Sequence, residues 1–366
     1  MLAAIVLSGA FLWGSGGSAA AQVASVQVEA PVIVTRTAQN GAVIVTLATK
    51  AAGAAIYYTT DGSTPTTASQ KYEAPFLIDR KTTVRALAAA TDGRSKVVSR
   101  RFAIDVPPDT LVWSDEFNDA TGAKAEPDPH VWTYDTGHSG FGNHELEHYC
   151  AWGSNAAPCS TANPSAYVGA DGAVHIVAQK LPSGEYASAR LKSQGLFSFQ
   201  YGRFEVRARV PEAQGFWPAA WLLGNNIATV DWPACGEMDV LERVNAALTP
   251  DWNEGSIHGI GFTGDKGLGT KFYFPPGQTA AGWHTYGMIW TKGTVAYYID
   301  DPAHPYVTYT TKDMKRLHGA VWPFDDGQSS YILLNLAIGG DWPHSPDAST
   351  PFPAEMLVDY VRVYTN

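Results

Sequence analysis

Residues 236–242, Gly-Glu-Met-Asp-Val-Leu-Glu, set three acids into an otherwise apolar run. Side chains alternate between the two faces of a β-strand, so Glu237 and Asp239 share one face. The third acid, Glu242, comes one position late for that face, because Leu241 occupies the expected place. A β-bulge that adds one residue between Asp239 and Glu242 would return Glu242 to the acidic face. The stretch therefore predicts a bulged strand with a core face and a carboxylate face.

Acids at alternate positions are often no more than a solvated strand face. Three carboxylates crowded on one face repel one another, however, and this costs stability unless the crowding serves to separate their pKa values. Carboxyl groups with separated pKa values are what acid/base and nucleophilic catalysis require. We therefore interpret Glu237, Asp239 and Glu242 as catalytic.

The composition predicts an all-β protein that acts on a neutral polymer. The 366 residues suit about two domains, and 35 Gly and 23 Pro interrupt the chain too often for long helices. The formal net charge is −10 and no run of basic residues occurs, which argues against nucleic acid and anionic membranes as partners. The 12 Trp and 17 Tyr supply flat faces that suit sugar rings, although most aromatic residues of a β-protein belong to its core.

Residues 1–21 are expected to be a secretory signal peptide, cleaved before Gln22. An apolar run spans Leu2 to Trp13 and small residues end the segment, although no Lys or Arg precedes the run. A membrane anchor would need roughly 20 apolar residues, more than this run supplies. We expect the mature protein to be secreted, to the periplasm or the medium.

Three cysteines become interpretable if the protein is exported, because disulfides persist in oxidising compartments. Cys150 and Cys159 bracket a short loop and are expected to form a disulfide. Cys235 is then left over, and we expect a buried, unreactive thiol because no cation or His adjoins it in the sequence.

Two β-domains are expected along the chain. Residues 28–104 carry short alternating runs and a tight Asp-Gly turn, which predict an immunoglobulin-like β-sandwich. Residues 105–110 contain adjacent prolines and are expected to be a linker. Residues 111–366 read as a larger sandwich of many strands. Upstream of the acidic strand, Trp217 and Trp221 lie four residues apart and could stack sugar units, although either could be core.

These residues resemble glycoside hydrolase family 16, whose fold is a β-jelly roll. The resemblance rests on Trp217-Pro-Ala-Ala-Trp-Leu222 and residues 232–242, and further matching motifs run in order from residue 111 to 366. The bulged E-x-D-x-x-E form is similar to the laminarinase branch, as is the segment 140–149, in which His144 and Glu147 depart from the commonest wording. Residues 56–66 and 83–88 resemble the small β-sandwich modules appended to chitobiases; a sugar-binding role and a spacer role both stay open.

The resemblance implies a retaining endo-acting hydrolase of β-1,3-glucan or mixed-linkage β-glucan. Glu237 would be the nucleophile that forms a covalent glycosyl-enzyme, and Glu242 would be the acid and later the base. Asp239 would orient and tune the nucleophile. His258 matches a family position near the acid/base, although a lone His is more often structural.

The same matching implies that Asn143 and Arg203 contact sugar hydroxyls; Arg203 could equally be a charge partner of Glu205. Catalysis should need no cofactor. A structural calcium is implied by the family, with Glu116 and Asp359 as its side-chain ligands. We expect a monomer. Two other functions stay open: hydrolysis of agar, carrageenan or a galactan, and carbohydrate binding without catalysis.

Overall fold

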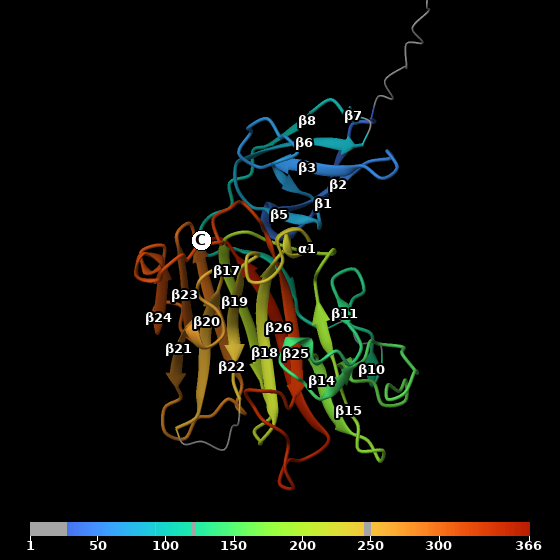
Figure 1. Cartoon of the computed structure of the whole chain (residues 1–366), viewed down its shortest axis with the longest axis vertical. Helices are drawn as coiled ribbons and strands as arrows, with labels where there is room; N and C mark the ends of the chain where they lie inside the picture. The colour runs from blue at the N-terminus through green and yellow to red at the C-terminus, as the bar shows by residue number, and fades with distance from the viewer. Residues whose placement is uncertain (1–27, 92, 119–121, 245–249) are drawn as a thin grey trace, which may run out of the picture.

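The computed structural model describes residues 28–91, 93–118, 122–244 and 250–366 and is built almost entirely of β-strands (Figure 1). The predicted signal peptide lies outside these residues. Within them no helix is long and apolar enough to cross a membrane. The helical segments are short: η1 (Gln39–Gly41), η2 (Gly140–Gly142), α1 (Ile227–Val230), η3 (Gly264–Lys266) and η4 (Asp313–Arg316).

The N-terminal module is a sandwich of two small antiparallel sheets around its own core. The first sheet has the order β1-β2-β5, from β1 (Val32–Thr37), β2 (Val43–Ala48) and β5 (Phe76–Ile78). The second has the order β4-β3-β6-β7 with β8 paired to β6, from β3 (Ala55–Thr59), β4 (Gln70–Lys71), β6 (Thr82–Ala90), β7 (Gly93–Arg94) and β8 (Val98–Phe102). Alternate apolar side chains of both sheets meet between them, as the sequence pattern predicts.

An eleven-stranded sheet forms one layer of the large domain. Its main path runs β10-β13-β14-β26-β17-β22-β23-β24, with β9 beside β26, β15 beside β14, and β12 beside β15. The strands are β9 (Leu111–Asp115), β10 (Lys124–Ala125), β12 (Glu147–Tyr149), β13 (Ala166–Gly169), β14 (Val174–Lys180), β15 (Tyr186–Ser188), β17 (Gly202–Arg209), β22 (His284–Thr291), β23 (Thr294–Ile299), β24 (Val307–Thr310) and β26 (Ala354–Tyr364).

The second layer is a seven-stranded sheet in the order β11-β16-β25-β18-β19-β20-β21. Its strands are β11 (Thr133–Asp135), β16 (Arg190–Lys192), β18 (Phe216–Gly224), β19 (Glu237–Glu242), β20 (Trp252–His258), β21 (Leu268–Tyr273) and β25 (Ser330–Ile338). The acidic strand β19 is interior to this sheet, and β18 and β20 pair with it on either side.

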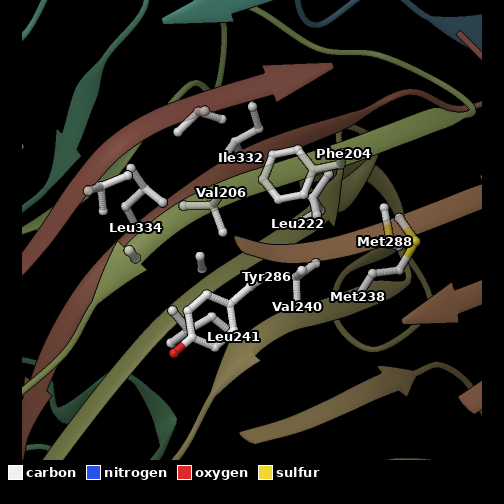
Figure 2. Close-up of a cluster of buried hydrophobic side chains, with 14 of the residues drawn as sticks. Phe204, Val206, Leu222, Met238, Val240, Leu241, Tyr286, Met288, Ile332 and Leu334 are labelled. Atoms are coloured by element: carbon white, nitrogen blue, oxygen red, sulfur yellow. The ribbon is translucent and has the colours of Figure 1, made fainter. Parts of the chain in front are cut away.

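The main core lies between these two layers (Figure 2). Phe204 and Val206 on β17 point inward, toward Leu222 on β18 and Val240 on β19. All four are at most 1% exposed. The period-two pattern of β17 thus fills the core with one set of side chains and turns the charged set outward.

The bulge predicted for the acidic stretch is present in β19. Ala220 of β18 pairs with Leu241, but the next residue, Trp221, pairs with Asp239, so Val240 is the extra residue. Val240 and Leu241 therefore both reach the core, although they are neighbours in sequence.

The N-terminal module packs directly on the large domain. The Leu77 amide donates to the Ser198 carbonyl oxygen at 3.0 Å, and the Ser198 hydroxyl donates to the Pro75 carbonyl oxygen at 2.9 Å. Ala42 and Ile44 of the module, both fully buried, belong to the main core. The two sandwiches therefore share a continuous buried surface.

Residues 105–110, the expected linker, are fastened at both ends. The Val106 amide donates to the Asp79 carbonyl oxygen of the module at 3.2 Å. The Thr110 amide donates to the Thr365 hydroxyl oxygen at 3.0 Å, and that hydroxyl donates to the Pro107 carbonyl oxygen at 2.6 Å. The segment runs between the module and the last strand of the large domain.

Candidate active site

Glu237, Asp239 and Glu242 all lie on the face of β19 that is turned away from the core. This follows from the bulge, because the three apolar residues between them pack inward. Asp239 is only 3% exposed, while Glu237 and Glu242 are partly accessible. The structure thus brings the three predicted carboxyls together on one accessible face.

Glu237 and Asp239 share a histidine but have different hydrogen-bond donors. The Trp232 indole donates to Glu237 Oε2 at 2.8 Å, and the Ser256 hydroxyl donates to Asp239 Oδ2 at 3.0 Å. His258 Nε2 lies 3.3 Å from Asp239 Oδ2 and 3.9 Å from Glu237 Oε1. Glu237, Asp239 and His258 offer ligand atoms within 4.8 Å of one another. These are the same atoms that acid/base chemistry would use.

Glu242 is held by tryptophan and by the neighbouring strand. The Trp217 indole donates to its Oε1 at 3.1 Å, and the Ser256 hydroxyl reaches its Oε2 at 3.4 Å. The Glu242 amide donates to Asn253 Oδ1 at 3.1 Å, which fixes the backbone just after the bulge. Ser256 therefore bridges the central acid and Glu242.

Burial raises the pKa values of all three carboxyls, and their mutual repulsion adds to the effect for the two glutamates. Burial, with the Asp239 charge next, raises the pKa of Glu237 to about 8. Burial raises the pKa of Asp239 to about 7, and the Ser256 hydrogen bond opposes that rise. Burial and then the Asp239 charge raise the pKa of Glu242 well above its ordinary value. Glu242 therefore holds its proton to a higher pH than an ordinary glutamic acid does, as a proton donor must.

Tryptophan rings extend the site to both sides of the carboxyls. Trp217 and Trp221 lie on β18 beside β19 and face outward. The Trp217 ring meets Trp342 edge to face, with centroids 5.4 Å apart, and Trp342 lies 6.0 Å from Trp252. Trp232, which holds Glu237, is 45% exposed. Such half-buried indole faces can pack against pyranose rings.

Asn143 lies in the loop after η2 and does not contact the carboxyl trio directly. The side-chain amide of Asn143 donates to Glu145 Oε1 at 3.1 Å. Glu145 also accepts from the Tyr149 hydroxyl at 2.8 Å. Tyr149 in turn accepts from Asn335 at 3.3 Å, and Asn335 accepts from the Trp221 indole at 2.7 Å. A hydrogen-bonded chain thus connects the Asn143 loop to the aromatic part of the site.

Sequence reasoning missed Arg190 and Ser256 and gave Trp232 no role. The Arg190 guanidinium lies 4.7 Å from the centre of the Trp221 ring, and its charge lowers the pKa of Glu237. No motif marks Arg190, since β16 reaches the site through sheet order alone. Ser256 could have been found, because it lies two residues before His258 and so shares its strand face.

Arg203 was wrongly predicted to touch substrate. It lies on β17, in the eleven-stranded sheet, whereas the carboxyls are on the other layer. Its neighbour Phe204 fills the core, so Arg203 must point out of the opposite side of the sandwich. There it forms an ion pair with Glu205 and covers the ring of Tyr364 at 3.8 Å. The alternative interpretation, a charge partner of Glu205, is correct.

The side chains of Glu116 and Asp359 do not fit a shared calcium site. Both oxygens of Glu116 accept hydrogen bonds from Arg362, at 2.9 and 2.8 Å. Asp359 accepts from Arg207 at 2.6 Å. Each carboxylate is already neutralised by a guanidinium, which removes the negative charge that calcium would need. We therefore assign no calcium to this pair.

The cysteines lie as the sequence suggested. Cys150 and Cys159 are joined by a disulfide with a Cα–Cα distance of 5.6 Å. Cys235 is a buried free thiol, and burial raises its pKa to about 12. A thiol with so high a pKa has almost no nucleophilic thiolate at neutral pH.

This site can protonate a leaving group with one carboxyl and attack with another, which places the molecule among the glycoside hydrolases. The family model described as Glycosyl hydrolases family 16 matches residues 154–361, and the one described as Fn3 associated matches residues 45–102. The chain belongs to glycosyl hydrolases family 16. Its two sandwich layers are the jelly roll of that family.

Known relatives support this placement. The β-glucanase of Rhodothermus marinus is 37% identical over 267 residues, which cover 69% of this chain and 84% of that protein. Glucan endo-1,3-β-glucosidase A1 of Niallia circulans is 33% identical over 69% of this chain and 37% of its own length. The catalytic domain of an endo-1,3-β-glucanase (laminarinase) from Thermotoga petrophila RKU-1 has a TM-score of 0.60 at 34% identity, covering 70% of this chain and 98% of that domain.

Proposed function

We propose that this protein is an endo-acting, retaining β-1,3-glucanase that hydrolyses laminarin and related β-glucans. The observation that carries the proposal is the outward-facing carboxyl trio on the bulged strand β19, set between Trp217 and Trp232. The names of the similar proteins, β-glucanase and endo-1,3-β-glucanase, support the glucan as substrate.

In this mechanism Glu237 attacks the anomeric carbon while Glu242 donates its proton to the leaving glycosidic oxygen. A covalent glycosyl-enzyme forms, and water activated by the now ionised Glu242 hydrolyses it. Two features support this division of roles. The Arg190 charge acts with the Trp232 indole and His258 to oppose the rise in the pKa of Glu237, and burial raises the pKa of Glu242 well above its ordinary value. Asp239 raises the pKa of both glutamates and needs no metal to do so.

The bulge in β19 is the basis for the glycosidic linkage that we propose the enzyme prefers. An extra residue bends β19 and re-aims Glu242, so the site should suit a chain that curves, as β-1,3-linked glucose does. Laminarin should be the best substrate, mixed-linkage β-1,3/1,4-glucan slower, and cellulose inert. We also propose that the protein is secreted and monomeric; the disulfide between Cys150 and Cys159 supports export to an oxidising compartment.

The test is the release of reducing ends from laminarin, mixed-linkage β-glucan, cellulose, agar and carrageenan. Proton NMR of the first product should show the β-anomer before mutarotation, as double displacement requires. An α-anomer first would contradict the mechanism. If the protein cleaves agar or carrageenan but not laminarin, its substrate is a galactan and not a β-glucan. If it binds laminarin and cleaves none of the polysaccharides, it is a carbohydrate-binding protein and not an enzyme.

A further inference from the structure

Two buried glutamates that catalysis does not use lie behind the aromatic part of the site. Glu145 is 5% exposed and Glu147 is fully buried. Both belong to the segment Asn143–Glu147, which is fastened to the end of β25: the Leu146 amide donates to the Ile338 carbonyl oxygen at 2.8 Å, and the Ile338 amide donates to Glu147 Oε2 at 2.6 Å. Two carboxyls so close together and so deeply buried cannot both carry a charge without a counter-ion.

The hydrogen bonds show which of the two is ionised. Both oxygens of Glu145 accept, one from Asn143 and the other from Tyr149. Every bond of the chain from Trp221 runs the same way, because each group donates toward Glu145. Glu145 is thus the common acceptor, which is the role of a carboxylate.

Glu147 has one oxygen left over. Its Oε2 accepts from Ile338, but its Oε1 is buried and has no hydrogen-bond partner. An unpaired buried oxygen is costly, and a proton on it would turn it into a donor. The Glu145 carboxylate is within hydrogen-bonding reach of the Glu147 side chain and can accept that proton.

We propose that Glu147 is a neutral carboxylic acid that donates its proton to Glu145, and that this bond positions Asn143 and Trp221 for glucan binding. Glu147 is a positioning residue, since it acts through Glu145 and does not touch the carboxyl trio. The binding part of the inference rests on the proposed function; the protonation part does not.

The surroundings of Glu147 supply little positive charge. On its own segment the titratable groups that act on Glu147 and its neighbours are Glu145 and Tyr149. The same segment carries His144, which bonds to Asp341 at 2.9 Å, and His148, whose side chain alternates to the other face of β12. His138, on the preceding loop, contacts only the Glu147 carbonyl oxygen, at 2.9 Å. Arg190 of β16 lowers the pKa of Tyr149. Burial and the facing Glu145 charge raise the pKa of Glu147 well above its ordinary value.

Glu147→Gln is the decisive variant, because its amide donates to Glu145 at every pH. A carboxyl with a raised pKa contributes stability that is complete below its ordinary value and lost as the pH rises through the folded-state value. The variant should therefore gain in Tm over the wild type as the pH rises from 5 to 9, on the order of 2 °C per pH unit. The infrared spectrum of the wild type minus that of the variant should show the carbonyl stretch of one protonated carboxyl, because the bands of the catalytic carboxyls are common to both proteins and cancel.

Glu355→Gln is the matched control. Glu355 accepts from His175 at 2.9 Å, and this bond lowers its pKa, so the same substitution should lose stability at neutral pH. If Glu147→Gln behaves like this control, or if the infrared band is unchanged, Glu147 is ionised and the proposal is wrong. These readouts need no substrate, so they hold whether or not laminarin is cleaved.

The positioning role is tested by laminarin kinetics. Glu147→Ala removes the donor and should raise KM roughly tenfold, whereas Glu147→Gln should restore the wild-type KM at pH 6. At alkaline pH the KM of the wild type should rise as Glu147 ionises, whereas the KM of Glu147→Gln should not change. The fall of kcat at alkaline pH should be the same in both enzymes. An equal alkaline rise of KM in both would overturn the positioning role.

Discussion

One indole hydrogen bond helps to decide the protonation state of the nucleophile. Trp232 is the direct donor to Glu237, and its bond opposes the rise in pKa that burial causes. Trp232→Phe keeps an aromatic face but removes the N–H, so the pKa of Glu237 should rise further. The acidic limb of kcat/KM should move to higher pH by about half a unit to one unit. Trp342→Phe, a change in a ring that packs on Trp217, is the control and should leave that limb in place.

Removing the nucleophile should separate activity from stability. Glu237→Gln should lower the hydrolysis of laminarin about 10²–10⁴-fold and leave binding largely intact. Because the pKa of Glu237 is raised to about 8, the wild type loses stability relative to this variant as the pH rises from about 4.5 to 8. The difference in Tm should grow across that window and level off above it. A variant that is less stable than the wild type at pH 8 would contradict the raised pKa.

Site residues that lie close together in the sequence could be predicted from it. The acids of β19 share a face because of strand periodicity, and the late position of Glu242 pointed to the bulge. Arg203 shows the limit of comparing motifs with those of a family. The motif around Arg203 is present in the sequence, but it lies in the eleven-stranded sheet and not in the sheet that carries the carboxyls. Arg190 reaches the site across three strands of the sheet, β16, β25 and β18, and no local pattern encodes that order.

The bulged strand β19 can be tested as an element. Deleting Val240 would give Glu-Met-Asp-Leu-Glu, a regular strand that keeps all three acids on one face. The bend would be lost, so activity on laminarin should fall relative to activity on mixed-linkage glucan. Both activities can be measured on the same preparation by release of reducing ends. An unchanged ratio would mean that the bulge does not set linkage preference.

Val240→Ala separates the packing of this residue from the bend of its strand. Val240 is 1% exposed within the main core, so the truncation should cost about 2 kcal/mol of stability. The bulge would remain, and the ratio of the two activities should be that of the wild type. Chemical denaturation and the same substrate pair measure both effects.

The whole molecule should unfold as one unit. Ile44 of the module is buried in the core of the large domain, and Leu77 bonds to Ser198 across the junction. Calorimetry of the full chain should therefore show a single transition. Ile44→Ala should lower its Tm without changing kcat on laminarin, because the junction is built from elements other than β19. Two separate transitions would show that the sandwiches are independent.

This docking could not be anticipated from composition. Adjacent prolines in residues 105–110 indicate an extended segment, but they do not say whether the two domains touch. The contacts that join them connect residues far apart in sequence, such as Pro75 and Ser198. Strand periodicity gave both sandwiches and left their relative placement open.

The position of β26 has a consequence for how the protein is made. This strand is the last of the described strands in chain order, yet it lies in the interior of the eleven-stranded sheet, between β14 and β17, and also pairs with β9. During synthesis the edges of β14 and β17 must wait unpaired until β26 has been translated. The larger sheet therefore cannot be completed before residues 354–364 have been synthesised, and its long-range pairing makes closure slow.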